Sequence, residues 1–84
     1  MIVDVLQKRI DEEKLIKEIQ SFEIVHNETA YLFMNKETLG DLASHYGELP
    51  WFHSSENLSG MLGYYTGRRI YENERLKFGE VEIR

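Results

Sequence analysis

The histidine and serine side chains of this chain are the residues best suited to catalysis or metal binding, but none has a spacing typical of an active site. His26, His45 and His53 do not form an H-E-x-x-H pattern, and the chain has no cysteine, so a shared metal site would require the fold to gather all three. Ser54 and Ser55 directly follow His53, but adjacent residues seldom orient a base toward a nucleophile, and no G-x-S-x-G surrounds them. We therefore expect no catalytic, cofactor-binding or metal-binding residues, and no enzyme.

Carboxylate pairs and a glycine-rich segment are the other candidate sites. Glu80 and Glu82 would share one face of a strand with about 7 Å between their Cα atoms, a spacing that suits two-carboxylate chemistry but is more typical of a solvated edge strand. Residues 60–69, Gly-Met-Leu-Gly-Tyr-Tyr-Thr-Gly-Arg-Arg, combine glycines with cations, as phosphate-binding loops do. They lack the Walker spacing, and a β-like run rather than a helix follows them. A ligand-binding module at this segment is the third of our functional hypotheses.

Aromatic and basic residues gather toward the end of the chain. Arg68 and Arg69 lie close in sequence to Tyr64, Tyr65 and Tyr71, and Arg and Tyr are typical of the residues that dominate binding energy at protein interfaces. The irregular stretch 48–60 also holds a Trp-Phe pair that is too apolar for a free loop tip. The residues predicted to bind a partner are Arg68, Arg69, Tyr65, Tyr71, Trp51 and Phe52.

Length and charge limit the class of protein. Eighty-four residues with 42% hydrophobic residues indicate one small folded domain, and the net charge is −5. Residues 1–60 carry −6 and residues 61–84 carry +1. This acidic majority argues against direct nucleic-acid binding, which needs a basic footprint. It suits either a surface kept soluble by charge or a surface that imitates nucleic acid toward a basic partner.

Targeting and membrane signals are absent from the sequence. The N-terminus lacks a basic region followed by a long apolar run, and no stretch approaches 18 apolar residues. We expect no membrane association. Because the chain has no cysteine, composition favours a reducing, cytoplasmic setting.

The first part of the chain is helix-like in composition, but its apolar residues form two separate stripes. One stripe lies within residues 2–10 and the other within residues 15–22, more than a quarter-turn away on a helical wheel. One interpretation is a break near residues 11–14, with Asp11 capping a helix over about 12–21 that follows a helical turn or a short strand. The other is that the N-terminal stripe packs on a second copy of the protein.

Runs of apolar residues and helix-capping residues predict the elements in the middle of the chain. Ala30–Met34 predicts a central strand buried on both faces, with residues 23–26 as a partner strand joined to it by a turn at 26–28. Asn35 as N-cap and Gly47 as terminator predict a helix between them, in which Gly40 would mark a close helix–sheet contact.

Three further strands are predicted after the irregular stretch. Met61–Tyr65 and Arg69–Tyr71 are β-like, with Gly67 as a turn or bulge, and Val81 and Ile83 alternate with charged residues. The predicted fold class is α+β, with two main helices packed on one face of a three- or four-stranded, mostly antiparallel sheet. The predicted buried residues are Leu15, Ile19, Tyr31, Phe33, Leu39, Leu42, Tyr46, Ile70, Val81 and Ile83.

Two segments resemble elements of tailed-phage HK97-type capsid proteins. Residues 31–42, Tyr-Leu-Phe-Met-Asn-Lys-Glu-Thr-Leu-Gly-Asp-Leu, are similar to the strand, Met-Asn-Pro, helix element of that family. Gly67-Arg-Arg-Ile-Tyr and Leu76-Lys-Phe-Gly-Glu-Val are similar to its later Gly-x-x-Val and Leu-Pro-x-Gly-x-Val element. Lys36 stands where the family has proline, and the chain is too short for a capsid shell protein. The resemblance implies a small phage or mobile-element protein with a reduced α+β fold, and it transfers no catalytic residue.

These observations favour a non-enzymatic protein-interaction module that is phage-encoded and self-associating. Its partner would be a protein, including a second copy of itself, and it would use no cofactor. The alternative is an acidic inhibitor or nucleic-acid mimic that binds a host or defence protein. In that case Glu12, Glu13, Glu18, Glu23 and Glu28 would form a row at phosphate-like spacing.

Overall fold

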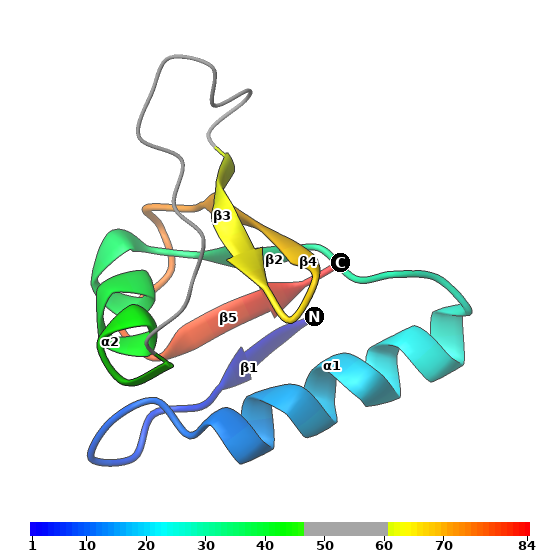
Figure 1. The fold of residues 1–84 in the computed structure, drawn as a ribbon, viewed down its shortest axis with the longest axis horizontal. Helices are drawn as coiled ribbons and strands as arrows, with labels where there is room; N and C mark the ends of the chain where they lie inside the picture. The colour runs from blue at the N-terminus through cyan, green and yellow to red at the C-terminus, as the bar shows by residue number, and fades with distance from the viewer. Residues whose placement is uncertain (47–60) are drawn as a thin grey trace.

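The computed structural model describes residues 1–46 and 61–84, without the side chains of His45 and Tyr46. In Figure 1, α1 runs below the strands and α2 lies at their left-hand end. The elements in chain order are β1 (Ile2–Asp4), α1 (Glu12–His26), β2 (Leu32–Met34), α2 (Lys36–Tyr46), β3 (Met61–Tyr65), β4 (Arg68–Glu72) and β5 (Glu80–Ile83).

The strands form one five-stranded mixed sheet in the order β1-β5-β2-β4-β3. Every pairing is antiparallel except that of β2 with β4, which is parallel. The two chain ends meet in the sheet, because the Ile83 amide donates to the Met1 carbonyl at 2.7 Å. The α+β class is confirmed. The predicted three or four mostly antiparallel strands are corrected to five in a mixed sheet, because the N-terminal residues add β1 and the crossover through α2 makes β2 and β4 parallel.

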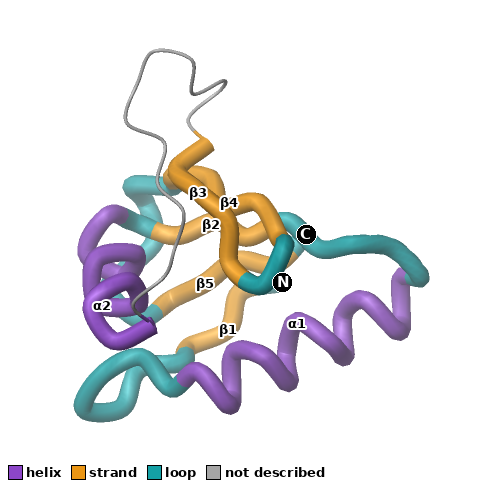
Figure 2. Tube along the Cα trace, in the orientation of Figure 1, coloured by secondary structure: helices purple, strands orange, loops and turns teal. Residues whose placement is uncertain are grey.

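The hydrophobic core lies between the helices and one face of the sheet. Leu32 at the sheet centre is paired with Ile70 on β4 and with Ile83 on β5, and all three are fully buried. Figure 2 shows the two helices and the strands that contribute to it. The helix residues buried in this core are Leu15, Ile19, Leu39 and Leu42.

Side-chain caps fix where the helices begin. The Asp11 carboxylate accepts from the Lys14 amide at 3.2 Å, and the Asn35 side-chain oxygen accepts from the Thr38 amide at 2.7 Å. Both N-caps were predicted, and they satisfy amides that have no partner within the helix. Asn27, in the left-handed conformation with φ of 53°, ends α1.

The strand predicted over residues 23–26 is wrong, because these residues form the last turn of α1. Their β-branched pair Ile24-Val25 favours strand by propensity. The helix nevertheless continues because it places the Glu23 carboxylate toward the interior, where it accepts from the Ala30 amide at 2.8 Å.

The prediction that Ala30–Met34 is buried on both faces is wrong, because β2 buries one face more completely than the other. Leu32 and Met34 are fully buried, whereas Tyr31 is 45% exposed and Phe33 is half-buried. The residues of this segment that face the core are therefore Leu32 and Met34, each one position after the predicted Tyr31 and Phe33. The Tyr46 side chain lies outside the described residues, and the other seven predicted core residues are buried.

Two turn glycines and one helix glycine differ in their surroundings. Thr66 and Gly67, with φ of 47° and 83°, form the turn between β3 and β4, a left-handed pair typical of a two-residue hairpin loop. Gly79 has φ of 88°, and a Cβ added there would lie 2.4 Å from the Leu6 Cβ. The close contact predicted at Gly40 is wrong, because that residue is exposed and a Cβ there would meet nothing within 4 Å.

We predict opposite effects on stability for alanine at two of these glycines. Gly40→Ala should raise the free energy of unfolding by about 1 kcal/mol, because it improves helix propensity in open space. Gly79→Ala should lower it by more than about 1 kcal/mol, because alanine is strained at positive φ and would overlap the Leu6 side chain. Urea denaturation measures both, and a destabilised Gly40→Ala variant would contradict the open environment.

Candidate partner-binding surface

The sheet face opposite the core, here called the open face, carries one continuous row of side chains across all five strands. Each member is the register partner of the next, so the row follows directly from strand pairing. No helix of residues 1–46 or 61–84 covers this face, since both helices bury their apolar sides in the core. The row, in order from β3 to β1, is Met61, Tyr71, Phe33, Glu82 and Ile2.

A second row lies beside the first and contains both arginines of the open face. Tyr64 on β3 pairs with Arg69 on β4, and the parallel register of β2 with β4 places Tyr31 beside Arg69. Tyr31 and Arg84 exchange backbone hydrogen bonds at 2.7 and 2.9 Å. The second row is therefore Tyr64, Arg69, Tyr31 and Arg84.

The aromatic rings of the two rows contact one another. Phe33 and Tyr71 are stacked with ring centroids 5.4 Å apart, and Tyr31 meets Tyr71 edge-on at 6.2 Å. The Arg84 guanidinium lies 4.2 Å from the centre of the Phe33 ring. Offset stacking, edge-on contact and cation–π contact each contribute about 0.5–1.5 kcal/mol. The side chains therefore hold one another in place on the open face.

Tyrosines surround the Arg69 guanidinium. Its hydrogen bond with Tyr71 raises the pKa of Arg69, and the electrostatic effects of Tyr71 and Tyr64 add to this. Arg84 is bound to Glu82 at 3.1 Å, and this hydrogen bond is the largest cause of the lowered pKa of Glu82. By alternation, the charged residues of the open face are Arg69, Arg84, Asp4, Glu80 and Glu82, and both arginines are exposed.

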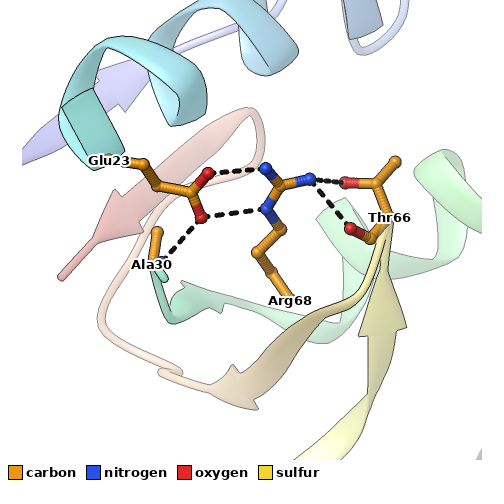
Figure 3. A network of polar contacts seen from close by, with 4 residues as sticks. All are labelled: Glu23, Ala30, Thr66 and Arg68. Carbon is orange, nitrogen blue, oxygen red and sulfur yellow. Dashed lines mark hydrogen bonds and ion pairs between the residues drawn. The ribbon is translucent and has the colours of Figure 1, made fainter. Parts of the chain in front are cut away.

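Strand alternation separates the two arginines that the sequence places side by side. Arg68 faces the helices, where its guanidinium donates to the Glu23 carboxylate at 3.0 and 2.5 Å and to the Thr66 carbonyl at 2.8 Å (Figure 3). The hydrogen bond to Arg68 is the largest cause of the lowered pKa of Glu23, and the same bond raises the pKa of Arg68. Arg68 thereby joins β4 to the last turn of α1.

Tyr65 also belongs to the interior rather than to a contact surface. It is 0% exposed, and its hydroxyl donates to the Glu12 carboxylate at 3.0 Å. Of the predicted partner-binding residues, Arg69 and Tyr71 lie on the open face, whereas Arg68 and Tyr65 lie on the covered face. Trp51 and Phe52 lie outside the described residues. The correction follows from the period of two in a strand, which sends neighbouring residues to opposite faces.

The structure also bears on the histidine and serine candidates for metal binding and catalysis. His26 is exposed beside the Phe22 ring, 4.1 Å between centroids, while His45, His53 and the Ser54-Ser55 pair cannot be placed from the described side chains. In the described part of the chain, no three His, Cys, Asp or Glu residues gather as a metal site. Nor does the described part contain a helix long and apolar enough to cross a membrane.

The geometry of the described residues also argues against the two-carboxylate site, the row of carboxylates and the glycine-rich phosphate loop. Glu80 accepts from the Lys77 amide at 2.8 Å and Glu82 binds Arg84, so each has a structural partner. Glu12 and Glu23 bind Tyr65 and Arg68 rather than forming an outward row of carboxylates. The described part of the glycine-rich segment is a β-hairpin, without the helix N-terminus that a phosphate cradle requires.

The predicted partner-binding set did not include Tyr31, Phe33 and Arg84, which make the ring and cation–π contacts of the open face. The first two were assigned to the core because all of Ala30–Met34 is apolar, which leaves the alternation undetermined. Arg84 carries no local signal, since its contact with Phe33 depends on the pairing of β5 with β2. Comparison of the chain with protein-family models, curated proteins and solved structures found no match in any of the three.

We predict that Glu23→Gln destabilises the protein above about pH 4 and has less effect in acid. The pair with Arg68 is mostly buried, with side chains 19% and 22% exposed, so its loss should cost about 1–3 kcal/mol at pH 7. Because the pKa of Glu23 is lowered on folding, this stability is present above the unfolded pKa of about 4.3 and is lost as the pH falls through the folded pKa.

Urea denaturation between pH 7 and pH about 3 checks this prediction. The difference between wild type and Glu23→Gln should shrink as the pH falls below about 4. Glu13→Gln, an exposed position on the same helix, is the control and should change stability little. A constant difference for Glu23→Gln across the whole range would contradict the assignment of that stability to the ion pair.

Proposed function

We propose that this protein is a non-enzymatic interaction module that binds a protein partner through the open face of its sheet. The observation that carries the proposal is the contacting set of aromatic rings and arginines on a face that no described helix covers. Tyr and Arg are the residues most often found as interface hot spots, because they combine a large contact area with polar groups. The mutual contacts of Phe33, Tyr71 and Arg84 reduce the entropy lost when they are immobilised by a partner.

The chemistry of the face defines the partner that would fit it. The exposed guanidinium of Arg69 favours a carboxylate, and the Phe33 and Tyr71 rings favour aromatic or aliphatic side chains. We therefore propose a partner surface with acidic residues next to apolar ones. Glu82 on the same face and the net charge of −5 disfavour a polyphosphate backbone.

The proposal also covers the origin of the protein, its cellular compartment and its self-association. The resemblance of residues 31–42, 67–71 and 76–81 to HK97-type capsid elements supports a phage or mobile-element origin. Action in the cytoplasm is proposed from the absence of cysteine, and self-association from the small size of the chain. In the structure the first segment covers β2 and the start of α2, residues 67–71 run from the hairpin turn into β4, and residues 76–81 end in β5. The strand–helix order of the first segment is thus compatible with the resemblance.

We predict that two open-face substitutions abolish partner capture while a matched charge change does not. The immobilised protein is incubated with lysate of the source cells, and the retained proteins are quantified by mass spectrometry. A partner retained by wild type should fall at least about tenfold with Arg69→Glu and with Tyr71→Ala, as expected for hot-spot residues. Arg75→Glu makes the same charge change in an exposed turn outside the sheet and should retain the partner.

The result that would contradict the proposal is equal retention by all four proteins. Thermal unfolding of each variant checks that it is folded. We expect all of them to fold, because Arg69 is exposed and Tyr71 is half-buried, so neither substitution changes a fully buried residue. Loss of the partner with Arg75→Glu alone would place the contact surface at the β4–β5 turn instead.

A further inference from the structure

The charges of the open face are separated along the direction of its strands. Strand pairing places Arg69 and Arg84 in the second row of side chains and Phe33 in the first row, two residues further along. Two residues further again, Glu80 on β5 is paired with Asp4 on β1. The open face is therefore basic at one end of the strands, aromatic in the middle and acidic at the other end.

Three of these charges are not balanced by another charge on the face. Arg84 is bound to Glu82 at 3.1 Å, so these two side chains form a pair of opposite charges. Asp4 and Glu80 each accept a hydrogen bond from a neighbouring backbone amide, at 3.0 and 2.8 Å, and an amide does not neutralise a carboxylate. The balance is one positive charge at the Arg69 end and two negative charges at the opposite end.

Arg69, Phe33 and Glu80 lie on one diagonal across the neighbouring strands β4, β2 and β5. Each step moves one strand across and two residues along, so the two ends of the diagonal are about 17 Å apart. The Phe33 ring in the middle lies between the Tyr71 ring, stacked at 5.4 Å, and the Arg84 guanidinium at 4.2 Å. A cation, an aromatic ring and an anion thus follow one another in line at equal spacing.

We infer that the partner contacts the open face along this diagonal, through a segment with an acidic residue at the Arg69 end, an apolar residue at Phe33 and a basic residue at the end formed by Glu80 and Asp4. The inference rests on the proposed function, because it names the chemistry and the direction of the partner at the same face. Opposite charges meet at both ends in this direction. The reverse direction would bring like charges together at both ends, so the segment binds in one direction only.

The length of the diagonal sets the spacing of the two charges in the partner. An extended segment rises about 3.3 Å per residue, so its acidic and basic residues would be about five positions apart, with the apolar residue between them. A helical segment rises about 1.5 Å per residue and would need about eleven positions. The spacing found in a bound segment therefore distinguishes the two conformations.

Selection from a random peptide library on immobilised protein tests the inference. The peptides are displayed on phage and are about 16 residues long, which is enough for either spacing. Peptides enriched by the wild type should share the order acidic, apolar, basic. One enriched peptide is then synthesised together with a second peptide of the same composition in which the acidic and basic residues are exchanged. Calorimetry should show that the exchanged peptide binds at least about tenfold more weakly.

Neutral variants assign this preference to the two ends of the diagonal. Arg69→Gln removes the charge at one end, and the double variant Asp4→Asn with Glu80→Gln removes it at the other while keeping an oxygen for each backbone amide. Each should reduce the preference for the enriched peptide over the exchanged one by about threefold. Arg75→Gln and Glu74→Gln, exposed in the turn between β4 and β5, are the matched controls and should leave the preference unchanged.

The outcomes separate this inference from the proposed function. Peptides that bind in either charge order with equal affinity, but are lost with Tyr71→Ala, overturn the inference and leave the open face as the binding surface. Peptides that bind Tyr71→Ala as tightly as wild type overturn both. The inference is also overturned if the wild type enriches no peptide, if a single-stranded oligonucleotide displaces the enriched peptides, or if sedimentation equilibrium shows a dimer that Arg69→Gln dissociates, since the occupant is then nucleic acid or a second copy.

Discussion

The register of β2 between β4 and β5 is the constraint on which the rest of the structure depends. Leu32 has Ile70 on one side and Ile83 on the other, so three strands bury their apolar residues on the same face. Since side chains alternate along a strand, this register also sends Phe33 to the opposite face with Tyr71 and Glu82. A shift of one residue would exchange the two faces, burying the arginines and exposing the core.

Polar contacts then hold the helices to the sheet that this register defines. Glu23 at the end of α1 accepts both from Arg68 on β4 and from the amide of Ala30 just before β2. Thr38 on α2 accepts from the buried amide of Gly79 at 3.0 Å. The bonds of Glu23 with Arg68 and of Thr38 with Gly79 each connect a helix to a strand or turn far away in sequence, 45 and 41 residues apart. Among the described residues, these polar contacts between helices and sheet all lie on the covered side of the sheet.

The sequence predicted local features better than long-range ones. The caps at Asp11 and Asn35 were found because capping depends on a few adjacent residues. The sequence did not predict which residues of β2 face the core, because every residue of Ala30–Met34 is apolar and the run therefore shows no alternation. The parallel pairing of β2 with β4 was missed for a related reason, since pairing depends on contacts between distant segments. The predicted partner-binding set inherited both errors: it grouped Arg68 and Tyr65 with Arg69 and Tyr71, and only the strand register separates the two pairs onto opposite faces.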